Sequence, residues 1–334
     1  MSVPERKKVV ATDVDVSDDL AKRVDAAGSG RYALKQLDKL SDNEKKEVEI
    51  LVLQSSPLVT RALFEDLPNL KVLQSMSAGV DFIDFSAIPP RVVVCSNAGA
   101  FGEPIAEHVF AMILYFGRNL VRNHDLVRGG TLDHPADGMF LRGKTIGIVG
   151  TGGIGHSVAR VAKGFKMRTV GINTSGRPVE NFDAVWRMDH LDDLLKQSDV
   201  VVIALPLNVK TRHLITAQKL GLMKEDCILV NVARGGVIAQ DALYAHLKAH
   251  PRFRAGIDVW WWYPKKGEKF SLDYPFFDLP NFLASPHNAD AVPEAMGLGQ
   301  EHAFENVIRY LDGEPLGRVI DKADYLGLRP ASGH

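Results

Sequence analysis

Gly150-Thr151-Gly152-Gly153-Ile154-Gly155 is the stretch of sequence that decides the fold of this chain. It follows an apolar, strand-like run at 145–149 and precedes a helix-like run at 156–163. Strand, glycine-rich turn and helix in this order form the context in which G-x-G-x-x-G binds a dinucleotide. Gly150 permits the tight turn, Gly152 lets the backbone approach a pyrophosphate, and Gly155 lets the helix pack closely on the strand. A glycine turn without a ligand is the alternative, but the flanking elements favour phosphate binding at the helix N-terminus.

Composition and charge indicate a globular protein of about two domains. The chain has 334 residues, of which 46% are apolar and 24% charged, values that are ordinary for a globular fold. The net charge of -1 gives no bulk attraction to nucleic acid or to a membrane. The apolar run at 109–116 is too short to span a bilayer, and the charged segment 1–8 lacks the apolar centre of a signal peptide. We therefore expect no nucleic-acid or membrane partner.

The two cysteines, Cys95 and Cys227, both lie in apolar, strand-like runs. Small buried thiols of this kind are typical of proteins in a reducing compartment. A cytoplasmic location is the default expectation, and the sequence suggests no metal site.

Strand-like and helix-like runs alternate through the first hundred residues. Buried strands are predicted at 49–53, 71–74 and 91–95, with helices at 18–27 and 60–67 between them. This alternation predicts a parallel sheet covered by helices on both faces.

A second series of strands begins at Thr145, just before the glycine turn, and its six strands are enough for a complete Rossmann domain. A long helix at 103–128 and a polar loop at 129–143 lead into it, and helices at 190–197 and 240–250 lie within it. No predicted strand of the second series follows the last helix, at 293–311. We therefore predict that this helix packs on the first domain. The predicted strands are 145–149, 168–172, 200–205, 228–232, 256–259 and 282–285.

Three polar motifs follow or end strands of this second series. Residues 231–236 and 285–288 each follow a strand, and Asp258 lies at the end of another. Because ligands of an open parallel sheet bind beyond the carboxyl ends of its strands, all three motifs are predicted at the edge that holds the dinucleotide.

Six motifs along the chain resemble those of the D-isomer-specific 2-hydroxy-acid dehydrogenases, and among them the glyoxylate and hydroxypyruvate reductases. The resemblance covers nearly the whole chain and consists of several separate motifs in the order that the family has. These motifs are 75–81 (SMSAGVD), 104–108 (PIAEH), 150–155, 205–207 (LPL), 231–235 (NVARG) and 285–287 (SPH).

The resemblance implies an α/β fold of two Rossmann-like domains with parallel sheets and an active site in the cleft between them. It assigns 1–100 plus 288–334 to a discontinuous, flavodoxin-like, substrate-binding domain and 101–287 to a dinucleotide-binding Rossmann domain. It also implies a homodimer that pairs through the helix at 103–128 and the loop after it.

Arg234 and His287 are the catalytic residues that the resemblance implies. A guanidinium forks onto the carboxylate of a 2-oxo acid and polarises the neighbouring carbonyl. Reduction of that carbonyl leaves an alkoxide, which an imidazolium can protonate near neutral pH. The alternatives are a surface ion-pair arginine and a structural histidine. The family's other carboxylate contacts correspond to the backbone N–H groups of Ala78, Gly79 and Val80.

The cofactor contacts implied by the resemblance include Asp258, which would accept a hydrogen bond from the nicotinamide carboxamide. The tip after strand 168–172 decides the preferred cofactor, because NAD-specific sites place a carboxylate there. Asn173, Thr174, Ser175 and Arg177 occupy this tip; they favour the 2'-phosphate of NADP, with NAD at an ordinary polar turn as the alternative. The remaining predicted cofactor contacts are Gly150, Gly152, Gly153, Ile154, Gly155, Leu205, Pro206, Val232 and Ile105.

Tyr263 is the main departure from the family pattern. Most members have a glutamate five residues after the equivalent of Asp258, where it pairs with the catalytic histidine, and Tyr263 takes that position here. Tyrosine can hydrogen-bond to imidazole but carries no charge near neutral pH. We therefore expect the imidazolium of His287 to be less stabilised than in glutamate-bearing relatives. Glu268 is a weaker candidate for the missing carboxylate.

The aromatic run at 260–263 has two interpretations. It packs at a domain or subunit contact, or it forms a pocket wall that favours a bulky substrate side chain, with Met76 and Phe101 nearby. The sequence alone does not decide between them.

The sequence predicts a reductase that uses NADP(H) on a small 2-oxo acid, namely glyoxylate, hydroxypyruvate or a bulkier analogue. A formate-type dehydrogenase is a weaker alternative, because such relatives carry glutamine where this chain has Tyr263. A protein that senses NAD(P) without turnover would share the fold, but the presence of Arg234 and His287 argues for chemistry.

Overall fold

Residues 7–54, 58–133 and 136–328 are described in the computed structural model of the chain. The chain forms two compact units, which we call unit 1 (Met1–Ala100 with Pro293–His334) and unit 2 (Phe101–Val292). The chain therefore returns to unit 1 at Pro293, rather than at residue 288. Residues 1–6 of the segment in which we predict no signal peptide lie outside the described residues. In the part that the structure describes, no helix is long and apolar enough to cross a membrane.

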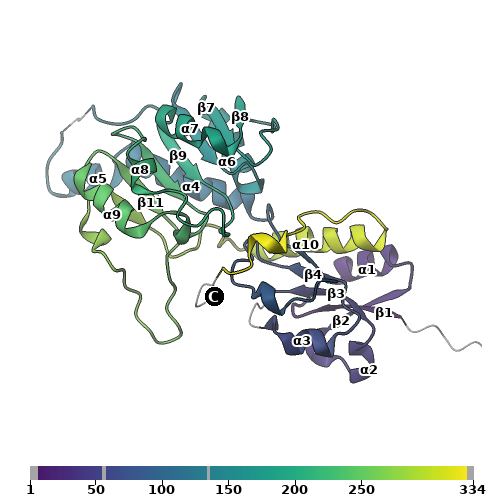
Figure 1. Cartoon of the computed structure of the whole chain (residues 1–334). Coiled ribbons are helices and arrows are strands. Elements are labelled where there is room, and N and C mark those ends of the chain that lie inside the picture. The colour runs from purple at the N-terminus through teal and green to yellow at the C-terminus, as the bar shows by residue number, and fades with distance from the viewer. Residues whose placement is uncertain (1–6, 55–57, 134–135, 329–334) are drawn as a thin grey trace, which may run out of the picture. The chain divides into compact units, whose positions relative to one another are not determined.

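Unit 1 is built on a parallel five-stranded sheet in the order β2-β1-β3-β4-β5, the strand order of flavodoxin-like folds. One face is covered by α1 and α10, which lie side by side although they are far apart in sequence (Figure 1). The other face is covered in part by α3. The elements are β1 (Lys8–Thr12), α1 (Asp18–Ala27), β2 (Tyr32–Gln36), α2 (Asp42–Lys45), β3 (Val48–Leu53), α3 (Arg61–Asp66), β4 (Val72–Ser75), β5 (Val93–Cys95) and α10 (Ala295–Leu311).

Unit 2 is built on a parallel seven-stranded sheet in the order β12-β11-β10-β9-β6-β7-β8. The chain order reverses between β6 and β9, which is the point where Rossmann sheets bind their ligands. The strands are β6 (Thr145–Val149), β7 (Arg168–Ile172), β8 (Ala184–Trp186), β9 (Val200–Ile203), β10 (Ile228–Asn231), β11 (Arg254–Ile257) and β12 (Phe282–Ala284). The helices are α4 (Gly102–Gly117), α5 (Leu120–Arg128), α6 (Gly153–Gly164), α7 (Leu191–Gln197), α8 (Ala217–Leu220) and α9 (Gln240–Ala249).

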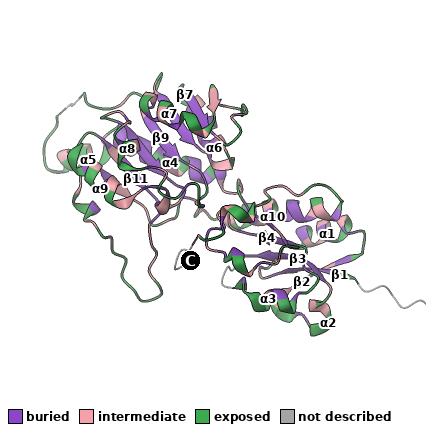
Figure 2. Ribbon diagram, in the orientation of Figure 1, coloured by how far each residue is buried: buried purple, intermediate pink, exposed green. Residues whose placement is uncertain are grey.

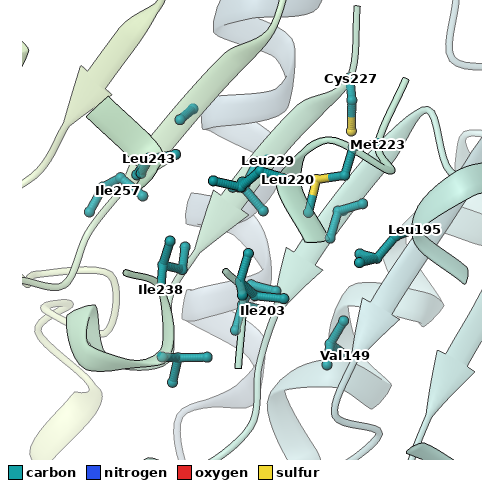
Figure 3. Packing of buried hydrophobic residues seen from close by; sticks show 14 of the residues in the cluster. Val149, Leu195, Ile203, Leu220, Met223, Cys227, Leu229, Ile238, Leu243 and Ile257 are labelled. Atoms are coloured by element: carbon teal, nitrogen blue, oxygen red, sulfur yellow. The ribbon is translucent and has the colours of Figure 1, made fainter. Parts of the chain in front are cut away.

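Each face of the unit 2 sheet has its own apolar core. Ile146 and Ile148 of β6 pack with α4 and α6, whereas Val149 packs with the helices of the opposite face. Figure 3 shows this second cluster, in which strand side chains meet Leu195 of α7 and Leu243 of α9. The central strands are buried and the outer surfaces of the helices are largely exposed (Figure 2). Burial on both faces explains why these strands are continuous apolar runs in the sequence.

The predicted strands are present with small shifts at their ends, but β1, β2 and β8 were not predicted. β2 and β8 lie at the edges of their sheets and are mostly half-buried, so their sequences lack the continuous apolar run of a central strand. β1 begins at Lys8, the last residue of the charged segment 1–8. The short apolar run of β1 was therefore not recognised as a strand.

The prediction of one long helix at 103–128 was wrong, because the structure has α4 and α5 with a break between them. Asn119 adopts a left-handed conformation (φ 50°, ψ 36°) at the start of α5, which asparagine tolerates better than most residues. The loop after α5 holds this break in place. Its Met139 N–H donates to the carbonyl of Gly117 (2.6 Å), and Asp137 accepts from the Asn119 amide (3.0 Å).

Candidate cofactor and catalytic site

The turn after β6 has the geometry that the glycine fingerprint predicts. Gly150 has φ +108°, and a Cβ there would lie 2.4 Å from the carbonyl oxygen of Ala204. A Cβ on Gly155 would lie 2.0 Å from the carbonyl oxygen of Gly150, so only glycine lets α6 approach β6 this closely. Around the Cβ position of Gly152, by contrast, no described atom lies within 4 Å. The turn is therefore packed against the sheet and open at Gly152.

The N-terminus of α6 is arranged to bind an anion. Gly152 is its N-cap and has no side chain to accept from the first-turn N–H groups, and the first turn contains no acidic residue. Unbonded N–H groups and the helix dipole together favour a phosphate at such an end. Since this end also lies where the strand order reverses, the residues present fit the pyrophosphate of a dinucleotide.

Asn173 builds the turn at the tip of β7. Its side-chain oxygen accepts from the backbone N–H groups of Ser175 (3.1 Å) and Gly176 (2.6 Å), and its amide donates to Thr151 Oγ1 (3.0 Å). The Ser175 hydroxyl also donates to Asn173 Oδ1 (3.2 Å). The structure therefore gives Ser175 a role inside the turn, besides the phosphate contact that we predicted for it.

Arg187, which sequence reasoning missed, lies against the same turn. It directly follows β8, and its Cγ is 2.7 Å from where a Cβ on Gly176 would be. Gly176 has φ +69°, so glycine both permits the turn and leaves room for this arginine. Arg187, Arg177 and Thr174 are all exposed. Only the pairing of β8 with β7 reveals the proximity of Arg187, because in sequence it lies well beyond the turn.

The loop that carries Arg234 is held by Asn231, the last residue of β10. The fully buried Asn231 side chain accepts from Ala233 N–H (3.0 Å) and donates to the Arg234 carbonyl (3.0 Å). The Arg234 guanidinium is half-buried and donates to the Ala233 carbonyl (2.8 Å). A Cβ on Gly235 would lie 2.3 Å from the backbone of Trp260, so glycine is needed where these two segments meet.

Asp258 organises the segment that carries His287. Its carboxylate is 1% exposed and accepts from Ser285 Oγ (2.6 Å) and from the backbone N–H groups of Asn288 (3.1 Å) and Ala289 (3.2 Å). His287 lies between these anchor points, is half-buried, and has φ 59°. Asp258 therefore supports the histidine segment, a role that the resemblance does not supply.

Tyr263 lies beside His287, with ring centroids 5.3 Å apart and ring planes at 37°. Its hydroxyl accepts from the backbone N–H of Trp260 (3.1 Å). The carboxylate of Glu268 accepts from the backbone N–H of Lys265 (2.9 Å), so it closes its own turn. The structure therefore places the aromatic ring of Tyr263 beside the imidazole of His287; its correspondence to the family glutamate remains a prediction.

The tryptophan run packs inside unit 2. Trp260 is 7% exposed and its indole N–H donates to the Ser285 carbonyl (3.1 Å), while the indole N–H of Trp261 donates to the Ile238 carbonyl (2.8 Å). Trp260 therefore contacts the histidine segment and Trp261 the loop after Arg234. These bonds show that both indoles pack within unit 2, which favours the packing interpretation. Trp262 stacks on Phe270.

The loop that we predict to bind the substrate carboxylate follows β4 in unit 1. The Asn97 N–H donates to the Ser77 carbonyl (2.9 Å) and the Asn97 amide donates to the Met76 carbonyl (3.0 Å). Ala78 and Gly79 are half-buried and Val80 is buried. Met76 is 5% exposed within the core of unit 1, so its side chain is not available to a substrate pocket. The substrate contacts of Ala78, Gly79 and Val80 remain predictions.

The other predicted cofactor residues also lie in unit 2. Leu205 and Val232 follow β9 and β10 and are buried, whereas Pro206 is exposed. Ile105 of α4 is 7% exposed in the core shared with α6, and Ile154 packs against that core. Their contacts with a cofactor remain predictions.

The site combines an open helix N-terminus with an arginine, a buried aspartate and a histidine at one edge of a Rossmann sheet, which defines a nicotinamide-dependent dehydrogenase. The chain belongs to the D-isomer-specific 2-hydroxyacid dehydrogenase family, because the model of this family's NAD-binding domain matches residues 110–289. It is an oxidoreductase that transfers hydride between a nicotinamide cofactor and a 2-hydroxy acid/2-oxo acid pair.

Known relatives support this assignment. The glyoxylate reductase of Pyrococcus furiosus is 33% identical over 286 residues, which cover 83% of each chain. An acyclic imino acid reductase solved with NADPH and D-Arg is 28% identical, with a TM-score of 0.71 over 95% of this chain and 100% of that one. A family member from Aeromonas salmonicida is 29% identical, with a TM-score of 0.73 over the same shares.

Proposed function

We propose that this protein is an NADP(H)-dependent reductase of small 2-oxo acids. The observation that carries the proposal is that Arg234, Asp258 and His287 follow or end β10, β11 and β12 at the sheet edge where α6 presents its open N-terminus. When bound, the nicotinamide cofactor supplies the hydride. Arg234 binds the substrate carboxylate and polarises its carbonyl, and His287 protonates the oxygen. Asp258 accepts from the carboxamide, and the backbone of 78–80 binds the carboxylate.

The preference for NADP follows from the charge at the tip of β7. This tip has no carboxylate to repel a 2'-phosphate; the exposed Arg177 follows Gly176 in sequence, and the exposed Arg187 packs against Gly176. Guanidinium groups bind phosphate well. The imino acid reductase to which the chain is similar was solved with NADPH, which is consistent with this preference.

Glyoxylate and hydroxypyruvate are the substrates that we propose first, because curated relatives about one-third identical are named glyoxylate reductase. A bulkier 2-oxo acid remains the alternative. Because Trp260 and Trp261 serve as internal packing, we expect small acids to be preferred.

The Arg234→Ala variant tests this function. We expect kcat/KM for glyoxylate with NADPH to fall about 100- to 1000-fold, since the site loses its charge and its carboxylate clamp. Arg252→Ala is the matched control, because Arg252 is an exposed arginine of unit 2 that pairs with Glu225. Equal activity of the two variants would contradict the proposal. Tight NADPH binding without turnover of any 2-oxo acid would instead favour a cofactor sensor.

Cofactor preference is tested by Arg177→Ala and Arg187→Ala. Each is expected to lower the ratio of kcat/KM for NADPH to that for NADH by about tenfold. Arg168→Ala is the control, because Arg168 lies at the opposite end of β7 and removes the same charge. An unchanged ratio in both test variants would show that the turn does not read the 2'-phosphate.

Tyr263→Glu tests how much the missing carboxylate matters to His287. The added charge lies beside the imidazole and favours its protonated form. The reductive kcat should then persist to higher pH than in the wild type, by about one pH unit. Superimposable pH profiles would show that Tyr263 is not at a position that acts on His287.

We also propose a homodimer, supported by exposed apolar side chains on α5 and the segment after it. Val127, Leu132 and Phe140 are 58%, 74% and 71% exposed, more than a solvated surface favours for such a group. Light scattering with size-exclusion chromatography should give twice the chain mass, and Val127→Asp should lower it. A monomeric wild type would contradict the proposal.

A cytoplasmic location remains part of the proposal. Both cysteines are buried free thiols, as expected in a reducing compartment. Fractionation of the source cells would test it, and recovery with secreted or membrane fractions would overturn it.

A further inference from the structure

His287 has a backbone conformation that needs support. Its φ of 59° lies in the left-handed region, which residues other than glycine adopt uncommonly. Such conformations persist only where the surrounding structure fixes them on both sides. The contacts on either side of His287 therefore help to hold its backbone in place, in addition to the Tyr263 ring beside its imidazole.

Asp258 supplies these contacts from the end of β11. Its Oδ1 accepts from Ser285 Oγ (2.6 Å), before the histidine, and from Asn288 N–H (3.1 Å), after it. Its Oδ2 accepts from Ala289 N–H (3.2 Å). One carboxylate therefore holds both ends of the segment. Since a carboxylate can accept about four hydrogen bonds, Oδ2 keeps capacity for one further donor.

His108 completes this arrangement from α4. Its Nε2 lies 3.0 Å from Ser285 Oγ and 3.7 Å from Asp258 Oδ1. The Ser285 hydroxyl donates its single proton to Asp258 Oδ1 (2.6 Å). Ser285 Oγ must then accept from His108, which fixes the proton on Nε2. The polar chain therefore runs from His108 through Ser285 to Asp258, and every donor has an acceptor.

The same contacts make this chain rigid. The Asp258 side chain is 2% exposed and that of His108 is 25% exposed, so both bonds to Ser285 form largely away from water, where they are strengthened. The Ser285 carbonyl also accepts from the Trp260 indole (3.1 Å). Ser285 is thus bonded through its hydroxyl and its carbonyl, and the orientation of its hydroxyl depends on His108.

We propose that His108 and Ser285 are positioning residues for His287: through Asp258 they hold the histidine segment in its left-handed conformation. This inference rests on the proposed function only in giving His287 the acid/base role. It also implies that a cofactor carboxamide bonded to Oδ2 of Asp258 shares one carboxylate with the histidine segment. Cofactor binding and histidine placement are then coupled through Asp258.

Amide hydrogen exchange tests the positioning role without any substrate. We expect the amides of Asn288 and Ala289, in the full-length protein, to exchange about five- to tenfold faster in Ser285→Ala and in His108→Leu. His108→Gln keeps a donor near Nε2 and should restore most of the protection. His250→Leu is the control, since His250 is an exposed histidine at the end of α9. Unchanged exchange in both Ser285→Ala and His108→Leu would overturn the proposal.

Kinetics supply the second readout. With NADPH and glyoxylate, kcat should fall about tenfold in Ser285→Ala and His108→Leu, while the Kd of NADPH changes less than about threefold. His108→Gln should recover at least half of the wild-type kcat. Should His108→Leu fail to fold, Ser285→Ala decides, and full activity with wild-type exchange in that variant overturns the proposal. A wild type that reduces no 2-oxo acid defeats the proposed function, whereas exchange still reports on the positioning role.

Discussion

Both units have a parallel sheet flanked by helices, but the turn after the first strand differs between them. In unit 1, β1 leads into α1, and in unit 2, β6 leads into α6. Both turns lie at the carboxyl edge of a parallel sheet, the edge at which ligands bind in such folds. Only the second turn has the features that hold a phosphate.

The turn of unit 1 is satisfied by its own side chains. Ser17 caps α1 by accepting from Leu20 N–H (3.3 Å), and Asp18 and Asp19 place negative charge in the first turn. Asp13 accepts from the N–H of Gln54 (2.8 Å). Because the N-terminus of α1 is capped by Ser17 and has two acidic residues in its first turn, it is less suited than that of α6 to an anionic ligand.

The turn of unit 2 leaves the same groups open. Gly152 caps α6 without a side chain, and a glycine at 150 and at 155 lets the turn and helix pack closely on β6. The fold provides a sheet edge in both units, and we attribute dinucleotide binding at the second edge to a few residues at the helix cap.

Gly155→Val should have the largest effect, because it breaks the close packing found only in unit 2. The new side chain would occupy the position of the Gly150 carbonyl oxygen, 2.0 Å from the Cβ, and α6 would have to move. We expect NADPH binding to weaken at least about 1000-fold, with loss of stability. Gly164→Val is the control, since no described atom lies within 4 Å of that Cβ position on the same helix. Comparable calorimetric Kd values for the two variants would contradict this.

Gly152→Asp should make the turn of unit 2 resemble that of unit 1. No described atom lies within 4 Å of the Cβ position, so the chain should fold normally and gain a helix cap. The carboxylate would occupy the anion site and repel the pyrophosphate, weakening NADPH binding about 100-fold. Gly152→Asn separates charge from bulk. Equal Kd values for the Asp and Asn variants would show that charge at this cap is not decisive.

Acidification should affect both units alike. Burial lowers the pKa of His302 in unit 1 and of His246 in unit 2 from 6.5 to about 4. The unfolded chain therefore binds more protons than the folded one between these values, and stability falls as pH drops through this window. From pH 7 to pH 5 we expect a loss on the order of 1 kcal/mol for each histidine, reduced by partial exposure.

Urea unfolding at the two pH values measures this loss in the free energy of unfolding. His302→Asn and His246→Leu should each flatten the pH dependence by about one-half of the combined loss. Identical free energies of unfolding at pH 7 and pH 5 in the wild type would rule out neutral burial of both histidines.

Ser17→Ala should have the smallest effect. The cap of α1 is lost, at a cost of about 0.5–1 kcal/mol, while NADPH binding stays unchanged because the cofactor belongs to the other turn. Thermal unfolding and calorimetry measure the two quantities. A weaker Kd for NADPH in this variant would mean that unit 1 contributes to the dinucleotide site.

Sequence reasoning found the glycine turn because its causes are local. A left-handed φ at Gly150 and the close approach at Gly155 demand glycine wherever the turn occurs, and the apolar run of β6 reflects burial on both faces. Edge strands such as β8 lack that pattern and were missed. The break at Asn119 was missed because it depends on Met139 and Asp137, which only the folded chain brings near.

In the candidate site, too, local motifs could be predicted from the sequence, whereas contacts between separate elements could not. The motifs around Arg234 and His287 are contiguous in sequence, so resemblance could place them. Arg187 contacts Gly176 and His108 contacts Ser285 from separate strands or helices. No spacing rule links such pairs, since each joins residues from separate elements.

Steady-state kinetics with NADPH and NADH over a panel of 2-oxo acids tests the central claim most directly. We predict reduction of glyoxylate and hydroxypyruvate, with kcat/KM for NADPH at least about tenfold above that for NADH, as expected for a tip that carries two arginines and no carboxylate. NADH used as well as or better than NADPH would contradict the assigned cofactor, and absence of turnover with every acid would contradict the reductase itself.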